Sequence, residues 1–167
     1  KLEYTCLQGS TDQEVKNVVY DSRKVEEGSL FICIRGAVVD GHKFVPDVVA
    51  KGAKVLIVEE AVEAPEDVTV ILVKDTRYAM AFISAAYFGY PAEKLKTIGI
   101  TGTKGKTTTT YMVKSILENA GYKVGLIGTI EAIIGDKVIP AKNTTPESYV
   151  IQEYFHEMAE AGCDCVV

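Results

Sequence analysis

Short apolar runs separated by polar turns divide the first half of the chain. Four of these runs are predicted strands, and they cover residues 15–19, 30–34, 55–58 and 68–73. The last two runs show no polar alternation, which is typical of buried parallel strands. Apolar residues at helical spacing predict helices over 44–51, closed by Gly52, and over 77–88, capped by Asp75. This order of strands and helices predicts a small α/β domain over residues 1–90.

The second half begins after a predicted linker at residues 91–96, which contains Pro91 and several charges. Apolar residues from Leu95 to Ile100 predict a strand, and the pattern after it predicts a helix to about Ala120. Further elements are predicted along the rest of the chain: a strand at 124–127, a hairpin of 130–134 with 137–139, a helix from Pro146 to about Ala161, and a strand at 163–167. Residues 97–167 therefore predict a second α/β unit.

Composition narrows the class of protein. The chain has 167 residues, 47% of them apolar, and a net charge of −5, with its basic residues scattered rather than clustered. We expect no nucleic-acid partner and no membrane partner, because no apolar run approaches the length of a membrane span. The N-terminus does not resemble a signal peptide, so a cytoplasmic location is expected. The four cysteines show no zinc-binding spacing, and no metal or disulfide role is predicted for them.

The candidate chemistry lies in the stretch 97–110, T-I-G-I-T-G-T-K-G-K-T-T-T-T. A G-x-x-G-K-T string can be an ordinary turn before a helix, but here it stands between a predicted strand and a predicted helix, the setting of a phosphate-binding loop. Ile100 stands where the usual pattern has its first glycine. Lys106 is the predicted catalytic residue, reaching the β/γ-phosphates, and the Thr107 hydroxyl is the predicted Mg²⁺ ligand. The predicted phosphate-binding set is Gly102, Thr103, Lys104, Gly105, Lys106, Thr107 and Thr108.

Other polar residues complete the prediction. A phosphate loop needs an acidic metal ligand at the end of a further strand, and Asp164 stands at the start of the last one. We therefore expect the chain to be the N-terminal part of a longer protein. His42 and His156 are predicted to have no partners that would make a metal or nucleophilic site, and His156 is placed on a solvated helix face. Asp21 and Arg23 are expected to form a local ion pair.

Three motifs together resemble the Mur ligase family, MurE type. They are D-S-R-K-V-E-E-G-S-L-F-I-C-I-R-G with D-G-H-K-F, then T-G-T-K-G-K-T-T-T-T, then N-T-T-P-E-S. The first two motifs also occur in the sister MurF ligases, and N-T-T-P-E favours MurE. Lys104 stands where many relatives have Asn, a change that should leave the backbone N–H cradle intact.

The resemblance implies an α/β fold in which a small uridine-nucleotide domain precedes the start of a P-loop, Rossmann-like ATPase domain that is truncated here. It implies that the muramoyl substrate contacts Tyr20, Ser22, Ala37, Val38, Val39, Asn143, Thr144 and Thr145. Each assignment has a structural alternative: Ser22 caps a turn, residues 37–39 form a plain loop, and residues 143–145 cap a helix.

The implied activity is ATP- and Mg²⁺-dependent ligation. The third amino acid, diaminopimelate or lysine, would be added to UDP-N-acetylmuramoyl-L-alanyl-D-glutamate through an acyl phosphate. The resemblance implies that a carbamylated lysine, an acidic metal ligand and a C-terminal domain lie beyond Val167, so this fragment alone is expected to be an inactive monomer. Two alternatives remain open, a MurF-type ligase and a P-loop nucleotide-binding module without ligase chemistry.

Overall fold

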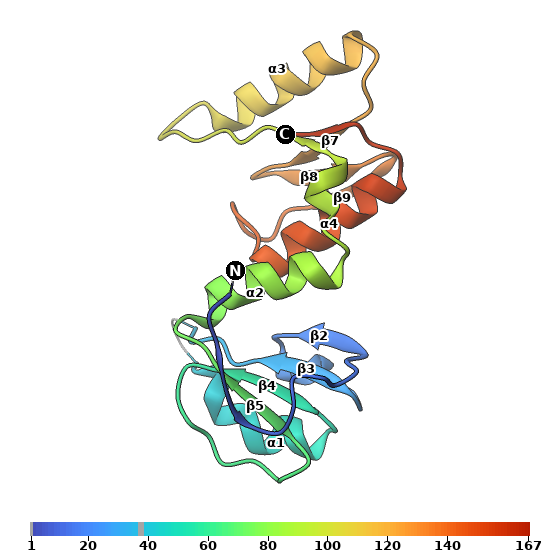
Figure 1. Ribbon diagram of the computed structural model, residues 1–167. Coiled ribbons are helices and arrows are strands. Elements are labelled where there is room, and N and C mark those ends of the chain that lie inside the picture. The colour runs from blue at the N-terminus through green and yellow to red at the C-terminus, as the bar shows by residue number, and fades with distance from the viewer. Residues whose placement is uncertain (1, 37–38) are drawn as a thin grey trace. The chain divides into compact units, whose positions relative to one another are not determined.

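The computed structural model describes residues 2–36 and 39–167, and the chain divides into two compact units, residues 1–82 and 83–167 (Figure 1). The division falls within helix α2 (Thr76–Tyr87). Each unit has its own sheet, so the mixed α/β class predicted from the sequence is confirmed. None of the described helices is both long enough and apolar enough to cross a bilayer.

The sheet of the first unit has the strand order β1-β5-β4-β3-β2. Its strands are β1 (Thr5–Gln8), β2 (Asn17–Val19), β3 (Ser29–Ile32), β4 (Val55–Val58) and β5 (Thr69–Leu72). Strands β2 to β5 are parallel. Of the two runs predicted to be buried, β4 is buried throughout, whereas β5 has two buried and two half-buried residues. The sequence did not predict β1, which pairs antiparallel with β5 at the sheet edge and is mostly exposed.

Short helices fill the connections of this sheet. They are the 3₁₀ helices η1 (Ser22–Lys24) and η2 (Gly41–Phe44) and the helix α1 (Val45–Ala50). Val45 and Val48 of α1 pack in one core with Phe31, Leu56 and Val70 of the strands. Burial of these apolar side chains is the main force that holds the unit together.

The sheet of the second unit has the strand order β6-β10-β7-β8-β9. Its strands are β6 (Lys96–Thr97), β7 (Val124–Ile127), β8 (Glu131–Ile134), β9 (Lys137–Pro140) and β10 (Cys165–Val166). Strands β6, β10 and β7 are parallel, and the predicted hairpin β8–β9 continues the sheet antiparallel. Strand β6 is shorter than the predicted run 95–100, and the predicted linker contains the 3₁₀ helix η3 (Pro91–Lys94), with Pro91 and Leu95 buried.

Two helices cover this second sheet, α3 (Lys106–Asn119) and α4 (Ser148–Glu160). Met158 of α4 packs on Val166, whereas Val113 and Leu117 of α3 pack on Cys165 and Val167. Because successive residues of a strand point to opposite faces, the two helices cover opposite faces of β10.

The start of α4 differs from its prediction. Pro146 was predicted as the first helical residue, but the helix begins at Ser148, and its N-cap Glu147 has an extended backbone (ψ 152°). The proline thus belongs to the polar loop before the helix. His156 also differs: its ring is half-buried and lies 5.6 Å from the ring of Phe88, so the predicted solvated face was wrong.

Candidate functional site

The phosphate-loop motif forms the entrance to α3. Gly105 is the N-cap of this 14-residue helix and has a left-handed backbone (φ 78°), a conformation that glycine adopts without steric cost. No side chain caps the helix within the described part of the chain, so its first N–H groups are available to an anion. The predicted order of strand, loop and helix is present, and phosphate binding by the loop stays a prediction.

The four threonines after Lys106 take different roles. The hydroxyl of Thr109 donates to the Gly105 carbonyl at 2.9 Å, and that of Thr110 donates to the Thr107 carbonyl at 2.7 Å. These bonds return to the helix backbone, a common habit of threonine inside helices. The hydroxyls of Thr107 and Thr108 have no hydrogen-bond partner among the described residues, and of these two residues Thr107 lines the cavity described below. The role of Thr107 as a Mg²⁺ ligand stays a prediction.

A cavity of about 430 Å³ opens beside the loop, entirely within the second unit. It lies at the carboxyl ends of the parallel strands β6, β7 and β10, the place where open α/β sheets bind ligands. Of the predicted site residues, Lys106, Thr107, Thr144 and Thr145 line it. The structure thus brings together two motifs that lie almost 40 residues apart in the sequence.

The remaining predicted residues of this unit lie outside the cavity wall. Gly102, Thr103, Lys104, Gly105 and Thr108 are exposed on the loop or the first turn of α3, and Asn143 is exposed in the polar loop. Because the N-cap of α4 is Glu147, residues 143–145 do not cap that helix, and this structural alternative is excluded.

Sequence reasoning missed the apolar wall of the cavity, which is formed by Ile98, Ile100, Ile127, Ile151, Phe155, Val166 and other residues. The signal available was the placement of apolar residues at the ends of predicted parallel strands, where a ligand-facing side chain looks like an ordinary core residue. Asp164 lies at the opposite end of β10, where its carboxylate accepts the Lys123 N–H at 2.8 Å, in agreement with its predicted exclusion from the site.

The turn after β7 is tied to α3 by one acidic side chain. The Glu131 carbonyl accepts the Gly128 N–H at 2.9 Å and so closes the turn, and the Glu131 carboxylate accepts the Tyr111 hydroxyl at 2.6 Å. This hydrogen bond raises the pKa of Tyr111, which stays protonated at neutral pH. Gly128 and Thr129 line the cavity, so this contact sets one of its walls.

In the first unit, predicted substrate residues follow the carboxyl ends of the parallel strands. Tyr20 and Ser22 come after β2, and Val39 follows β3, whereas Ala37 and Val38 lie outside the described residues. Ser22 is not the cap of η1, because the Asp21 carboxylate accepts the Arg23 N–H at 3.0 Å. The Asp21–Arg23 ion pair is formed as expected, and the Arg23 side chain holds the pKa of Asp21 at about 2.

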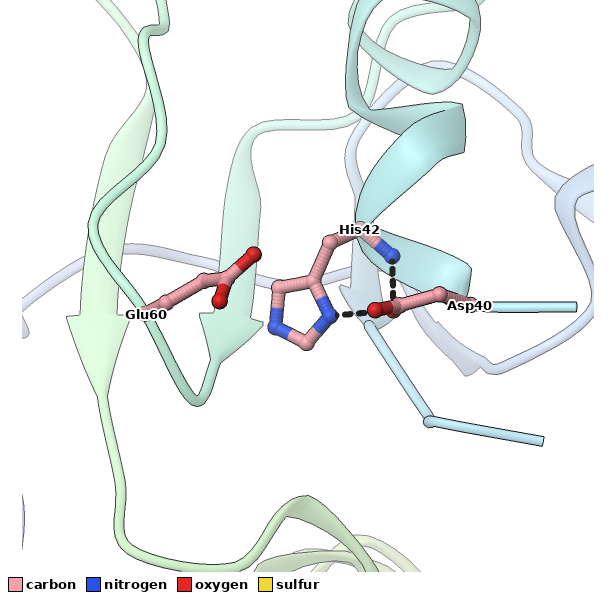
Figure 2. Close-up of side chains that lie close together, drawn as sticks. All are labelled: Asp40, His42 and Glu60. Carbon is pink, nitrogen blue, oxygen red and sulfur yellow. Dashed lines mark hydrogen bonds and ion pairs between the residues drawn. The ribbon is translucent and has the colours of Figure 1, made fainter. Parts of the chain in front are cut away.

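The ring of His42 has two hydrogen-bond partners that the sequence did not indicate. Its Nδ1 lies 2.6 Å from the Asp40 carboxylate (Figure 2). Its Nε2 accepts the backbone N–H of Glu59 at 2.9 Å. Ligand atoms of Asp40, His42 and Glu60 lie within 4.8 Å of one another, which is metal-like spacing. Both ring nitrogens are already engaged, however, and the Arg35 guanidinium contacts Asp40 and Glu60. A divalent cation here would lose histidine ligation and face a fixed positive charge, so the cluster is an ion-pair network.

Two family models match the chain, one in each half. The model for the Mur ligase family, catalytic domain, matches residues 14–88, and that for the Mur ligase middle domain matches residues 100–167. The chain belongs to the Mur ligase family. This Mur ligase chain is 52% identical over 167 residues to the UDP-N-acetylmuramoyl-L-alanyl-D-glutamate--2,6-diaminopimelate ligase of Clostridium perfringens, covering 99% of the chain and 34% of that protein. The ligase of the same name from Clostridium tetani is 47% identical over 171 residues, covering 100% and 35%.

Solved structures resemble the same Mur ligase chain. A UDP-N-acetylmuramoyl-L-alanyl-D-glutamate--2,6-diaminopimelate ligase matches with a TM-score of 0.75 and 24% identity, over 92% of this chain and 31% of that one. MurF from Acinetobacter baumannii matches with a TM-score of 0.59 and 29% identity, over 93% and 30%. MurF from Thermotoga maritima, solved in complex with ADP, matches with a TM-score of 0.57 and 22% identity, over 92% and 31%. The chain thus spans about a third of the length of the relatives it matches.

Proposed function

We propose that this chain is the substrate- and ATP-binding portion of a ligase that adds the third amino acid to UDP-N-acetylmuramoyl-L-alanyl-D-glutamate. The observation that carries the proposal is the shared cavity, in which Lys106 and Thr107 face the same space as Thr144 and Thr145. One pair belongs to a phosphate-binding loop and the other to the loop that the family uses for the muramoyl peptide. A cavity lined by both is where a phosphoryl group and a carboxylate would meet.

The chain's own groups suit the first step, transfer of the γ-phosphoryl group of ATP to the substrate carboxylate. Both reactants are anionic, so their approach must be made less repulsive. Lys106 and the uncapped N–H groups of α3 would hold the phosphates, and the Thr107 hydroxyl would hold Mg²⁺. Mg²⁺, when bound, would supply positive charge that offsets the negative charge of the phosphates. ADP leaves, and the product of this step is an acyl phosphate.

In the second step the amine of the incoming amino acid attacks the acyl carbon, an amide bond forms, and inorganic phosphate and a proton leave. No protein nucleophile is needed. Thr144 and Thr145 would hold the acyl group in the cavity, and the apolar wall formed by Ile127, Ile151 and Phe155 would help exclude water that competes with the amine.

Diaminopimelate is the amino acid that we propose, because the relatives at 52% and 47% identity both carry it in their names. A MurF-type ligase is less well supported, since the MurF structures share 29% identity or less with this chain. A P-loop module without ligase chemistry does not account for the match of the family model to residues 14–88.

The test is a ligase assay on the full-length protein that carries this sequence. The protein is incubated with ATP, Mg²⁺, UDP-N-acetylmuramoyl-L-alanyl-D-glutamate and either diaminopimelate or lysine, and the tripeptide product is measured by mass spectrometry. We expect product with diaminopimelate together with one ADP per amide bond. Product with lysine alone would reverse the amino-acid assignment, and ATP hydrolysis without product would contradict the ligase.

A further inference from the structure

His42 forms a bridge between two loops of the first unit. The residue is 7% exposed, and its ring contacts the Asp40 carboxylate on one side (Figure 2) and the backbone N–H of Glu59 on the other. Since Nε2 accepts a hydrogen bond, it carries no proton, and the single proton of the neutral ring lies on Nδ1. That proton is donated to Asp40. The two partners thus select one neutral tautomer of the ring.

Both partners of the His42 ring are themselves held by other contacts. On one side, the Asp40 carboxylate also accepts the His42 backbone N–H at 3.0 Å, and Asp40 pairs with Arg35 across the loop that follows β3. On the other side, the Glu59 carboxylate accepts both the N–H and the hydroxyl of Thr76 at 2.8 Å, at the first residue of α2. The loop after β3, the loop after β4 and the start of α2 are therefore tied together through one imidazole ring.

This edge is the carboxyl end of the parallel strands β2, β3 and β4, where open α/β sheets bind ligands. Val39 precedes Asp40 directly, and its carbonyl accepts the Gly36 N–H at 3.0 Å, so the position of Val39 depends on that of Asp40. A shift of Asp40 would move Val39 with it. A loop that is already held in its binding conformation has less freedom to lose when the ligand binds. The bridge would therefore raise the affinity for a ligand at this loop.

We propose that His42 is a positioning residue for nucleotide binding: its neutral ring presets the loop that carries Val39 to receive the uridine part of the muramoyl substrate. The proposal rests on the proposed function and on the family resemblance, which implies substrate contact at Val39 and Ser22. In this role His42 does not contact the substrate. It acts through Asp40 on one side and through the Glu59 backbone on the other.

The test compares the effect of one substitution on the binding of two different ligands. Isothermal titration of the full-length protein that carries this sequence measures binding of UDP-N-acetylmuramoyl-L-alanyl-D-glutamate and, separately, of a non-hydrolysable ATP analogue. His42→Phe keeps the ring shape but removes both hydrogen bonds, and we expect about tenfold weaker binding of the muramoyl ligand with unchanged binding of the ATP analogue. His42→Gln retains an acceptor and a donor, and we expect it to recover most of the affinity.

Val48→Ala is the matched control, because Val48 is fully buried in the core of the first unit and takes part in none of the hydrogen bonds of the bridge. We expect this substitution to lower the melting temperature and leave the affinity for the muramoyl ligand unchanged. Equal affinity of wild type and His42→Phe would overturn the positioning role. Absence of muramoyl binding in the wild type would instead contradict the proposed function of the first unit.

A spectroscopic measurement tests the bridge even if His42→Phe does not fold. The ¹⁵N chemical shifts of the wild-type imidazole ring distinguish the tautomers, and at pH 7.5 we expect a protonated Nδ1 with an unprotonated Nε2. A ring that carries its proton on Nε2 could not accept from Glu59, so that result would remove the basis of the proposal.

Discussion

The ammonium group of Lys106 donates a hydrogen bond to the Gly102 carbonyl at 2.6 Å, within the loop that precedes its own helix. The side chain thus folds over the loop and stands beside the uncapped N–H groups of α3. To contact a phosphate group, the ammonium group has to exchange the carbonyl oxygen for a phosphate oxygen. The latter is the stronger partner, because it is charged.

Replacement of Lys106 by Ala should therefore weaken binding of a non-hydrolysable ATP analogue by at least about tenfold, while the melting temperature changes little, because an exposed hydrogen bond adds little to stability. Titration calorimetry on the full-length protein that carries this sequence compares the wild type with each variant. Lys94→Ala is the matched control, since Lys94 is exposed in the same unit and is not among the residues that line the cavity. Equal loss of binding in the two variants would mean that the loop senses overall charge rather than one ammonium group.

Tyr111→Phe removes the hydroxyl that the Glu131 carboxylate accepts at 2.6 Å. Glu131 then loses its link to α3, so the turn at Gly128 and Thr129 is less well held beside the cavity. We expect a loss of about 1 kcal/mol in stability and a several-fold weaker affinity for the ATP analogue. Tyr122→Phe serves as the control, because its ring still packs beneath the Lys96 ammonium group at 4.9 Å. A change in melting temperature without any change in affinity would limit the Tyr111 contact to folding.

The ion pair of Asp21 with Arg23 predicts a pH dependence. The Arg23 side chain lowers the pKa of Asp21 from 3.8 to about 2, so the pair contributes fully above about pH 4 and is lost as the pH falls toward 2. The contribution of this pair to the stability of the fold is small, because Arg23 is exposed and its charge is screened by solvent. Carbon-detected NMR titration of the Asp21 carboxyl group should give a midpoint near 2 in the wild type.

Arg23→Ala should raise that midpoint toward 3.8, because the hydrogen bond from the Arg23 side chain is the largest cause of the shift. Lys24→Ala should move it much less, since Lys24 contributes only a weak charge effect. A midpoint that stays near 2 without the Arg23 side chain would show that the backbone N–H alone holds the carboxylate.

Gly41 is the first residue of η2, and the backbone of Ile34, which follows β3, lies close to it. A Cβ atom at this position would lie 2.8 Å from both the N and the O of Ile34, closer than real contacts allow. We expect Gly41→Ala to destabilise the first unit by about 1–3 kcal/mol, because the backbone has to move to relieve the overlap. Gly99→Ala is the control, since a Cβ there meets no atom within 4 Å. Thermal unfolding measures both, and equal stability of the two variants would contradict the close approach.

Local patterns predicted most of the elements, because their causes lie within a few residues. The strand, loop and helix around Lys106 are an example, because the glycines of the loop and the apolar residues of the helix all lie in one short stretch of sequence. Strand β1 escaped prediction because it is held by pairing with β5, more than 60 residues away, and shows no apolar face of its own. The start of α4 was placed too early because Pro146 also suits an extended segment, and the chain stays extended through Glu147.

The site residues that belong to a sequence motif could be predicted. The residues that only the fold brings together could not. Lys106 and Thr107 were assigned from the loop itself, and Thr144 and Thr145 from the family resemblance. The bridge through His42 depends on the Glu59 backbone, 17 residues further along, and no local pattern indicates that contact. The apolar wall was missed for a different reason, since Ile127 and Phe155 cannot be told from core residues by sequence pattern alone.

The place of β10 has a consequence for synthesis on the ribosome. This strand, at residues 165–166, lies between β6 at 96–97 and β7 at 124–127, so its neighbours are made long before it. Until it emerges from the exit tunnel, β6 and β7 have no partner between them and the apolar faces of α3 and α4 lack their common support. The first unit, complete by residue 82, closes its sheet earlier. Nascent chains should therefore acquire protease resistance in two steps, with the second delayed until residues near 166 have left the tunnel.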